Sequence, residues 1–188
     1  MLLKEHKDLK VAIIAIPPKE KDKLLLRLIA KDKVLTEHLH FKLLEDEENL
    51  KERYELLVND IEETMDLLKK GRKITSKDTL TIARKLNGKI NHHYKVTKDV
   101  NTELELRIFL LSLTPIDFKE GIFSPLHKYN EKLMTYFLRT TLSAFNKYKK
   151  LHEDLQFDLK DNFNAIFTKI YKSKLAVMAE DLRLPKEL

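Results

Sequence analysis

Residues 47–70 read EENLKERYELLVNDIEETMDLLKK, and this stretch decides the fold. Its apolar side chains recur every three or four positions, which places them on one face of an α-helix. The members of this stripe are Leu50, Tyr54, Leu57, Ile61, Met65 and Leu68. Acidic residues precede the stripe and Lys69 and Lys70 follow it, as the helix dipole favours. We therefore expect a helix over 47–70 that ends at Gly71 in the left-handed conformation.

The composition extends this expectation to the whole chain. The 188 residues include 34 leucines but only 3 glycines and 5 prolines. Because tight turns depend on glycine and proline, a fold of many short strands and a glycine-rich phosphate loop are both excluded. The length suits one domain. We expect a single all-α domain over residues 1–188, with a sub-boundary near 115–124.

The same periodicity predicts seven or eight helices. The early segments are short, and over residues 1–70 they resemble the helix pairs of α-solenoids such as HEAT repeats, a likeness of architecture that implies no function. The later helices are long and should pack antiparallel. Those ahead of 47–70 are expected over 3–16, after Pro17-Pro18 and over 33–44; those after it over 78–94, 102–114, 125–150 and 153–181. Residues 125–181 could instead form one bent helix.

Local signals predict three helix ends. Asp32 is a candidate cap for the helix over 33–44, or else it lies inside one helix that continues from the preceding segment. Thr102 to Glu105 has the capping-box pattern, so a helix should begin at Thr102 after a loop. Ser124 followed by Pro125 has the pattern of a cap and a first helical residue.

Charge is distributed unevenly along the middle of the chain. Residues 45–66 hold ten acidic side chains, and residues 69–98 hold ten basic ones. One interpretation is a helical hairpin whose opposite charges favour antiparallel pairing. The other is a basic face open to phosphates or to an acidic partner. The residues expected to bind such a partner are Lys69, Lys70, Arg72, Lys73, Lys77, Arg84, Lys85 and Lys89.

Residues 80–88, LTIARKLNG, resemble the first helix and turn of a helix-turn-helix DNA-binding motif. The interval from Ala83 to Gly88 is five residues, where the motif has four. The alternative is one amphipathic helix in which Gly88 is an internal residue.

Catalytic and metal-binding patterns are missing from the sequence. Without cysteine, thiol catalysis and thiolate metal sites are excluded. The seven histidines include no pair three or four residues apart, the spacing at which two metal ligands share a helix face. No serine has the surroundings of a hydrolase nucleophile. We expect no enzyme activity, no cofactor and no metal.

Three functions remain as hypotheses. The leading one is a non-catalytic interaction or scaffold protein with a protein partner, a homodimer included. The second is nucleic-acid binding through residues 69–98, which the net charge of +6 allows. The third is an enzyme or small-ligand protein with a site between helices. No apolar run approaches the roughly 20 residues that span a bilayer, so no membrane partner and a cytoplasmic location are expected.

Overall fold

The computed structural model describes residues 5–71, 74–121 and 123–188. Within them the chain forms nine α-helices and no strand, as expected for an all-α protein. The last expected helix is divided into α8 and the short α9. The helices are α1 (Lys7–Ala15), α2 (Pro18–Ile29), α3 (Lys33–Leu44), α4 (Glu47–Lys70), α5 (Ser76–Thr97), α6 (Val100–Leu113), α7 (His127–Tyr148), α8 (Glu153–Tyr171) and α9 (Ala176–Asp181).

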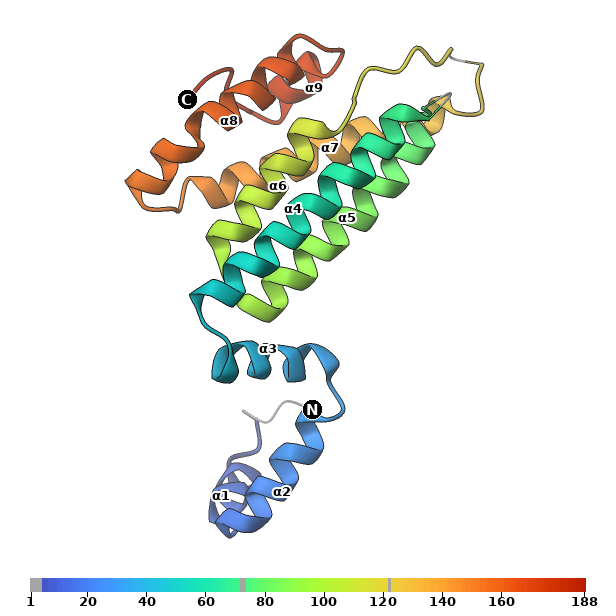
Figure 1. The fold of residues 1–188 in the computed structure, drawn as a ribbon. Coiled ribbons are helices and arrows are strands. Elements are labelled where there is room, and N and C mark those ends of the chain that lie inside the picture. The colour runs from blue at the N-terminus through green and yellow to red at the C-terminus, as the bar shows by residue number, and fades with distance from the viewer. Residues whose placement is uncertain (1–4, 72–73, 122) are drawn as a thin grey trace.

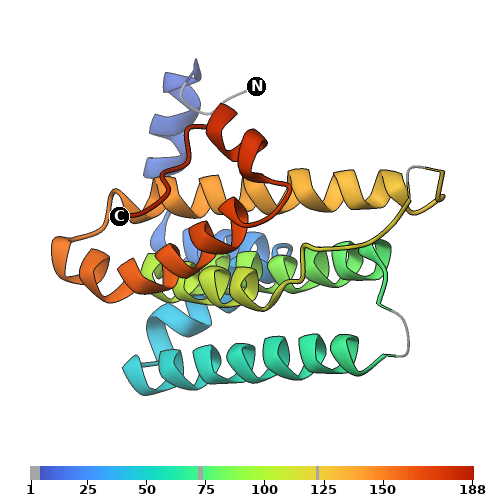
Figure 2. The same ribbon diagram turned by 90° about the horizontal axis from the view of Figure 1, so that it is seen from above.

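Helices α4 to α8 form a bundle in which α5 and α6 are central. α5 packs against α3, α4, α6 and α7, whereas α6 packs against α4, α5, α7 and α8. α4 and α7 therefore lie on opposite sides of the α5–α6 pair (Figure 2). α4 and α6 run antiparallel to α5, and α7 runs parallel to it.

Two apolar clusters hold the bundle together. The smaller lies between α4, α5 and α6 and includes Ile61 and Met65, the two fully buried members of the predicted stripe. The larger lies between α6, α7, α8 and α9. There the ring centres of Tyr148 and Phe163 are 4.9 Å apart, which joins α7 to α8.

The short helices α1, α2 and α3 precede the long ones, in the expected order. They extend from the bundle as an arm (Figure 1). None of their side chains is fully buried, so they do not share a core of the kind that stacked solenoid repeats build.

The starts of α3 and α4 agree with the sequence, because in each a capping side chain lies next to the first turn. α4 covers the predicted residues, with Asp46 and Asn49 forming a capping box. α3 begins as predicted because Asp32 accepts a hydrogen bond from the Leu35 N–H at 3.0 Å. The left-handed conformation predicted for Gly71 is wrong. Its φ is −61°, and its N–H closes the last turn on the Leu68 carbonyl.

Two further predictions about helix limits are corrected, and two alternatives that the sequence left open are decided. α6 begins at Val100 because Asp99, not Thr102, caps it, and the left-handed Lys98 (φ 60°) reduces the preceding loop to two residues. Ser124 accepts the Leu126 N–H in a turn, and α7 begins only at His127. α7 and α8 are separate helices. α5 is continuous through Gly88, so no helix-turn-helix turn exists there.

Candidate functional site

The arm formed by α1, α2 and α3 has a strongly apolar surface. The exposed fraction is 66% for Val11, 67% for Leu26 and 74% for Leu44. The other exposed large apolar side chains of the arm are Leu9, Ile13, Ile14, Leu24, Leu25, Leu28, Leu35 and Leu43. Scattered apolar residues are normal on a protein surface, but a concentration of this kind makes the arm a candidate binding surface.

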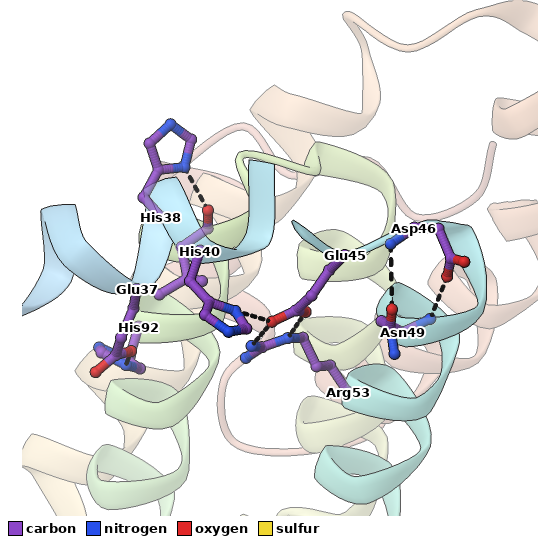
Figure 3. Close-up of polar contacts among 9 residues, drawn as sticks. Glu37, His38, His40, Glu45, Asp46, Asn49, Arg53 and His92 are labelled. Atoms are coloured by element: carbon purple, nitrogen blue, oxygen red, sulfur yellow. Dashed lines mark hydrogen bonds and ion pairs between the residues drawn. The ribbon is translucent and has the colours of Figure 1, made fainter. Parts of the chain in front are cut away.

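A polar joint attaches the arm to the bundle where α3 meets α4 (Figure 3). Arg53 on α4 donates two hydrogen bonds of 2.6 Å to the Glu45 carboxylate, from Nε and Nη2. His40 Nδ1 lies 2.8 Å from the same carboxylate. Hydrogen bonding to Arg53 lowers the pKa of Glu45 from 4.5 to about 2. The carboxylate is therefore charged at neutral pH and holds the end of α3 against α4.

The joint also connects α3 to α5. The His38 Nδ1–H donates to the Val96 carbonyl at 2.5 Å, and the Glu37 carboxylate lies 2.6 Å from His92 Nε2 (Figure 3). These contacts fix α3 on the bundle. α1 and α2 are connected to the rest of the protein mainly through α3.

The outer face of α4 is acidic. Its exposed carboxylates belong to Glu47, Glu48, Glu52, Glu55, Glu62 and Glu63. Within the described chain, only Glu55 of these has an ion pair, at 3.9 Å from Lys51. Leu56 and Leu67 are also exposed on this helix, at 62% and 72%. The face thus combines negative charge with accessible apolar surface.

The predicted basic residues are divided between two sides of α5. α4 and α5 form the hairpin that their charges predict, and Lys89 Nζ lies 2.7 Å from Asp60 Oδ2 between them. Lys85 lines a cavity on the same side, together with Leu56 and Leu57. Both lysines therefore face the acidic helix.

Four of the remaining predicted residues lie at or beyond the end of α4. Lys69 and Lys70 are exposed in its last turn, and Lys69 lies 3.9 Å from Asp66. Arg72 and Lys73 lie outside the described residues.

Lys77 and Arg84 lie on the other side of α5, against α7. Lys77 Nζ is 5.6 Å from the ring centre of Tyr129, and the Arg84 guanidinium is 5.8 Å from that of Tyr136. Cations over tyrosine rings at these distances are attracted by the ring electrons.

A cavity of about 560 Å³ opens between α5, α6 and α7. We call it the basic groove; its cations are Arg84, Arg107, Lys132 and Arg139. Of these, only Arg84 is among the residues that the sequence predicted to bind a partner. The seven-residue interval between Lys132 and Arg139 could have shown that they share one face of α7, but not that this face meets Arg84.

A buried ionic cluster lies beside the groove. Glu103 has no exposed surface, and its carboxylate accepts hydrogen bonds from Arg107 Nε at 2.9 Å and Lys147 Nζ at 2.6 Å. Arg107 also donates to the side chains of Asn87 and Asn91. Since these partners use its donors, Arg107 has a structural role, and the accessible cations of the groove are the other three.

Known proteins offer no guide to the use of these surfaces. No protein-family model, curated protein or solved structure matches the chain. Among the described residues, no group of three or more His, Cys, Asp or Glu side chains is placed to hold a metal ion. In the same part of the chain, no helix combines the length and the apolar character needed to cross a membrane.

Proposed function

We propose that this chain is a non-catalytic interaction protein whose arm binds a second copy of the chain. The observation that carries the proposal is the exposure of eleven large apolar side chains on α1, α2 and α3. Burying one such side chain fully is worth about 1.5–3 kcal/mol, a free energy that the isolated chain gains only in part. We place this function in the cytoplasm, the compartment expected for a chain without cysteine.

Charge complementarity favours a second copy as the partner. α1 and α2 carry six basic residues and three acidic ones, whereas the outer face of α4 carries six exposed glutamates around two exposed leucines. The arm points away from the bundle of its own chain (Figure 1). A neighbour's α4 can receive it, and reciprocal docking of two arms closes a two-fold dimer.

Size-exclusion chromatography with light scattering tests this proposal on the full chain. We expect a dimer at micromolar concentration and a monomer for the double variant Leu25→Glu/Leu26→Glu. The matched control is Phe157→Glu/Val177→Glu, which changes two exposed apolar residues outside the arm and should remain dimeric. Circular dichroism confirms that each variant is helical. A monomeric wild type, or a dimeric arm variant, would refute the proposal.

Charge exchange tests whether the arm meets α4. The variant Glu52→Lys/Glu55→Lys places positive charge on the acidic face and should weaken the dimer. Adding Lys19→Glu/Lys23→Glu on α2 should restore it, because the two surfaces again carry opposite charge. A dimer unaffected by the first pair of substitutions would exclude α4 as the receiving surface.

A further inference from the structure

We propose that the basic groove between α5 and α7 binds the sugar–phosphate backbone of a single-stranded nucleic acid. The groove lies on the bundle, and its residues take no part in the arm. The inference therefore stands apart from the proposed dimer.

The groove presents cations that no protein carboxylate neutralises. Within the described chain, Arg84, Lys132 and Arg139 form no ion pair; the acidic side chain that lines the cavity is Glu131. Glu131 is 69% exposed, and its carboxylate lies 3.6 Å from His127. Unpaired arginines in a cavity suit phosphate, which accepts two parallel hydrogen bonds from a guanidinium.

The positive charge continues beyond one end of the cavity. At one end Lys77 and Lys128 lie 5.6 and 5.3 Å from the ring centre of Tyr129. At the other end Lys147 lies 4.8 Å from the ring centre of Tyr94, but its charge is neutralised by Glu103 at 2.6 Å, so the line of unpaired cations ends at Arg139. Because α5 and α7 run parallel, these groups follow one line along the two helices.

The length of this line indicates a chain of phosphates rather than one small anion. Lys132 and Arg139 are seven residues apart on α7, which separates their backbone positions by about 10 Å along the helix axis. A polymer with regularly spaced charges can bind both.

Aromatic and hydroxyl groups between the cations favour nucleic acid over an acidic protein. Tyr136 lies in the cavity with its hydroxyl bonded to the Ala83 carbonyl at 3.2 Å, so its ring is held in place. Tyr129 offers a second ring, and nucleobases stack on such rings without regard to sequence. Thr135 and Ser143 line the same cavity and can donate to phosphate oxygens.

The negative charge on the opposite side of the bundle favours the approach of a polyanion to this groove. Helices α4 and α7 lie on the two sides of the α5–α6 pair (Figure 2), so the acidic outer face of α4 is separated from the basic groove between α5 and α7. A polyanion is repelled by the first and attracted by the second, an asymmetry that orients its approach.

Fluorescence anisotropy with a labelled single strand of about 16 nucleotides, the upper site size of common single-strand-binding folds, tests the inference. We expect binding that weakens as salt is raised. Arg84→Gln/Arg139→Gln should reduce the affinity at least tenfold and lower the salt slope by about 1.4, or about 0.7 for each lost phosphate contact. The control Lys85→Gln/Lys95→Gln removes the same charge from exposed positions on α5 and should bind as the wild type does.

Two further measurements test whether the groove recognises a single-stranded nucleic acid in particular. Tyr129→Leu should weaken binding several-fold without changing the salt slope, whereas Tyr129→Phe should have no effect, because stacking needs the ring and not the hydroxyl. A duplex of equal length and inorganic polyphosphate should both compete poorly.

Four results would overturn the inference: no binding even at low salt, equal losses for both charge variants, full competition by duplex or polyphosphate, or unchanged binding by Tyr129→Leu. Circular dichroism of each variant excludes unfolding as the cause of a loss.

Discussion

Lys147 Nζ on α7 lies 2.6 Å from Oε2 of Glu103 on α6, and Glu103 has no solvent-exposed surface. Arg107, one turn further along α6, occupies the other carboxylate oxygen. A buried carboxylate is tolerated when cations surround it, and the removal of one leaves charge poorly compensated. The cluster therefore joins α6 to α7.

Replacing Lys147 by methionine should lower the free energy of unfolding by about 3 kcal/mol, because Glu103 loses one of its two cations. Urea unfolding followed by circular dichroism measures the change. Lys150→Met, at an exposed position just beyond α7, should stay within about 0.5 kcal/mol of the wild type. A similar, small effect for both substitutions would show that the cluster contributes little.

The joint between the arm and the bundle should weaken in acid. The pKa of Glu45 is about 2 in the folded chain and 4.5 ordinarily, so its ion pair stabilises the fold above pH 4.5 and is lost as the pH falls toward 2. The difference in unfolding free energy between the wild type and Glu45→Gln should be constant near neutral pH and shrink below pH 4.5. Glu48→Gln, at an exposed position on α4, should show no such dependence. A constant Glu45→Gln difference across this range would contradict the prediction.

Lys169 should give a pH dependence of the same sign as Glu45, but at alkaline pH. Burial lowers its pKa from 10.5 to about 8, although it donates to the Ser112 and Thr114 carbonyls at 2.9 and 2.6 Å. Between these values the unfolded chain binds more protons, so this group makes stability rise with pH. Urea unfolding on both sides of pH 8 should show that Lys169→Met lacks this contribution, while the exposed Lys160→Met retains it. Parallel curves of unfolding free energy against pH for Lys169→Met and the wild type would contradict this prediction.

Gly88→Ala should stabilise the protein by about 0.5–1 kcal/mol. Gly88 lies within α5, its φ is not positive, and a Cβ atom there would meet no atom within 4 Å. Alanine reduces the backbone entropy of the unfolded chain and favours the helix. Thermal unfolding should show a raised midpoint, and a lowered one would mean that the helix needs glycine at this position.

The sequence predicted those features that neighbouring residues determine. The helix over 47–70 was placed correctly because its apolar period and its cap are both local, and Asp32 was a correct candidate cap for the same reason. Gly71 was misjudged because its φ depends on the direction in which the chain leaves the helix, which composition does not encode.

The surfaces were harder to predict because they depend on which helices meet. Arg84 and Arg139 are 55 positions apart and face one cavity only because α5 packs beside α7. The arm is a second case in which the sequence pattern does not reveal which helices meet. Leu24, Leu25 and Leu28 form an apolar stripe like those of the core, but local pattern alone does not reveal that the described chain leaves this stripe uncovered.

Because the arm is attached to the bundle through α3, small movements of α3 are amplified at the tip of the arm. α2 alone is about 18 Å long, so a small rotation of α3 on the bundle displaces the tip of the arm much further than it displaces any atom of the joint. The hydrodynamic radius of the monomer, and the reach of its arm toward a neighbour, therefore depend on how firmly α3 is held, by Arg53 at its end and by the contacts of Glu37 and His38 with α5.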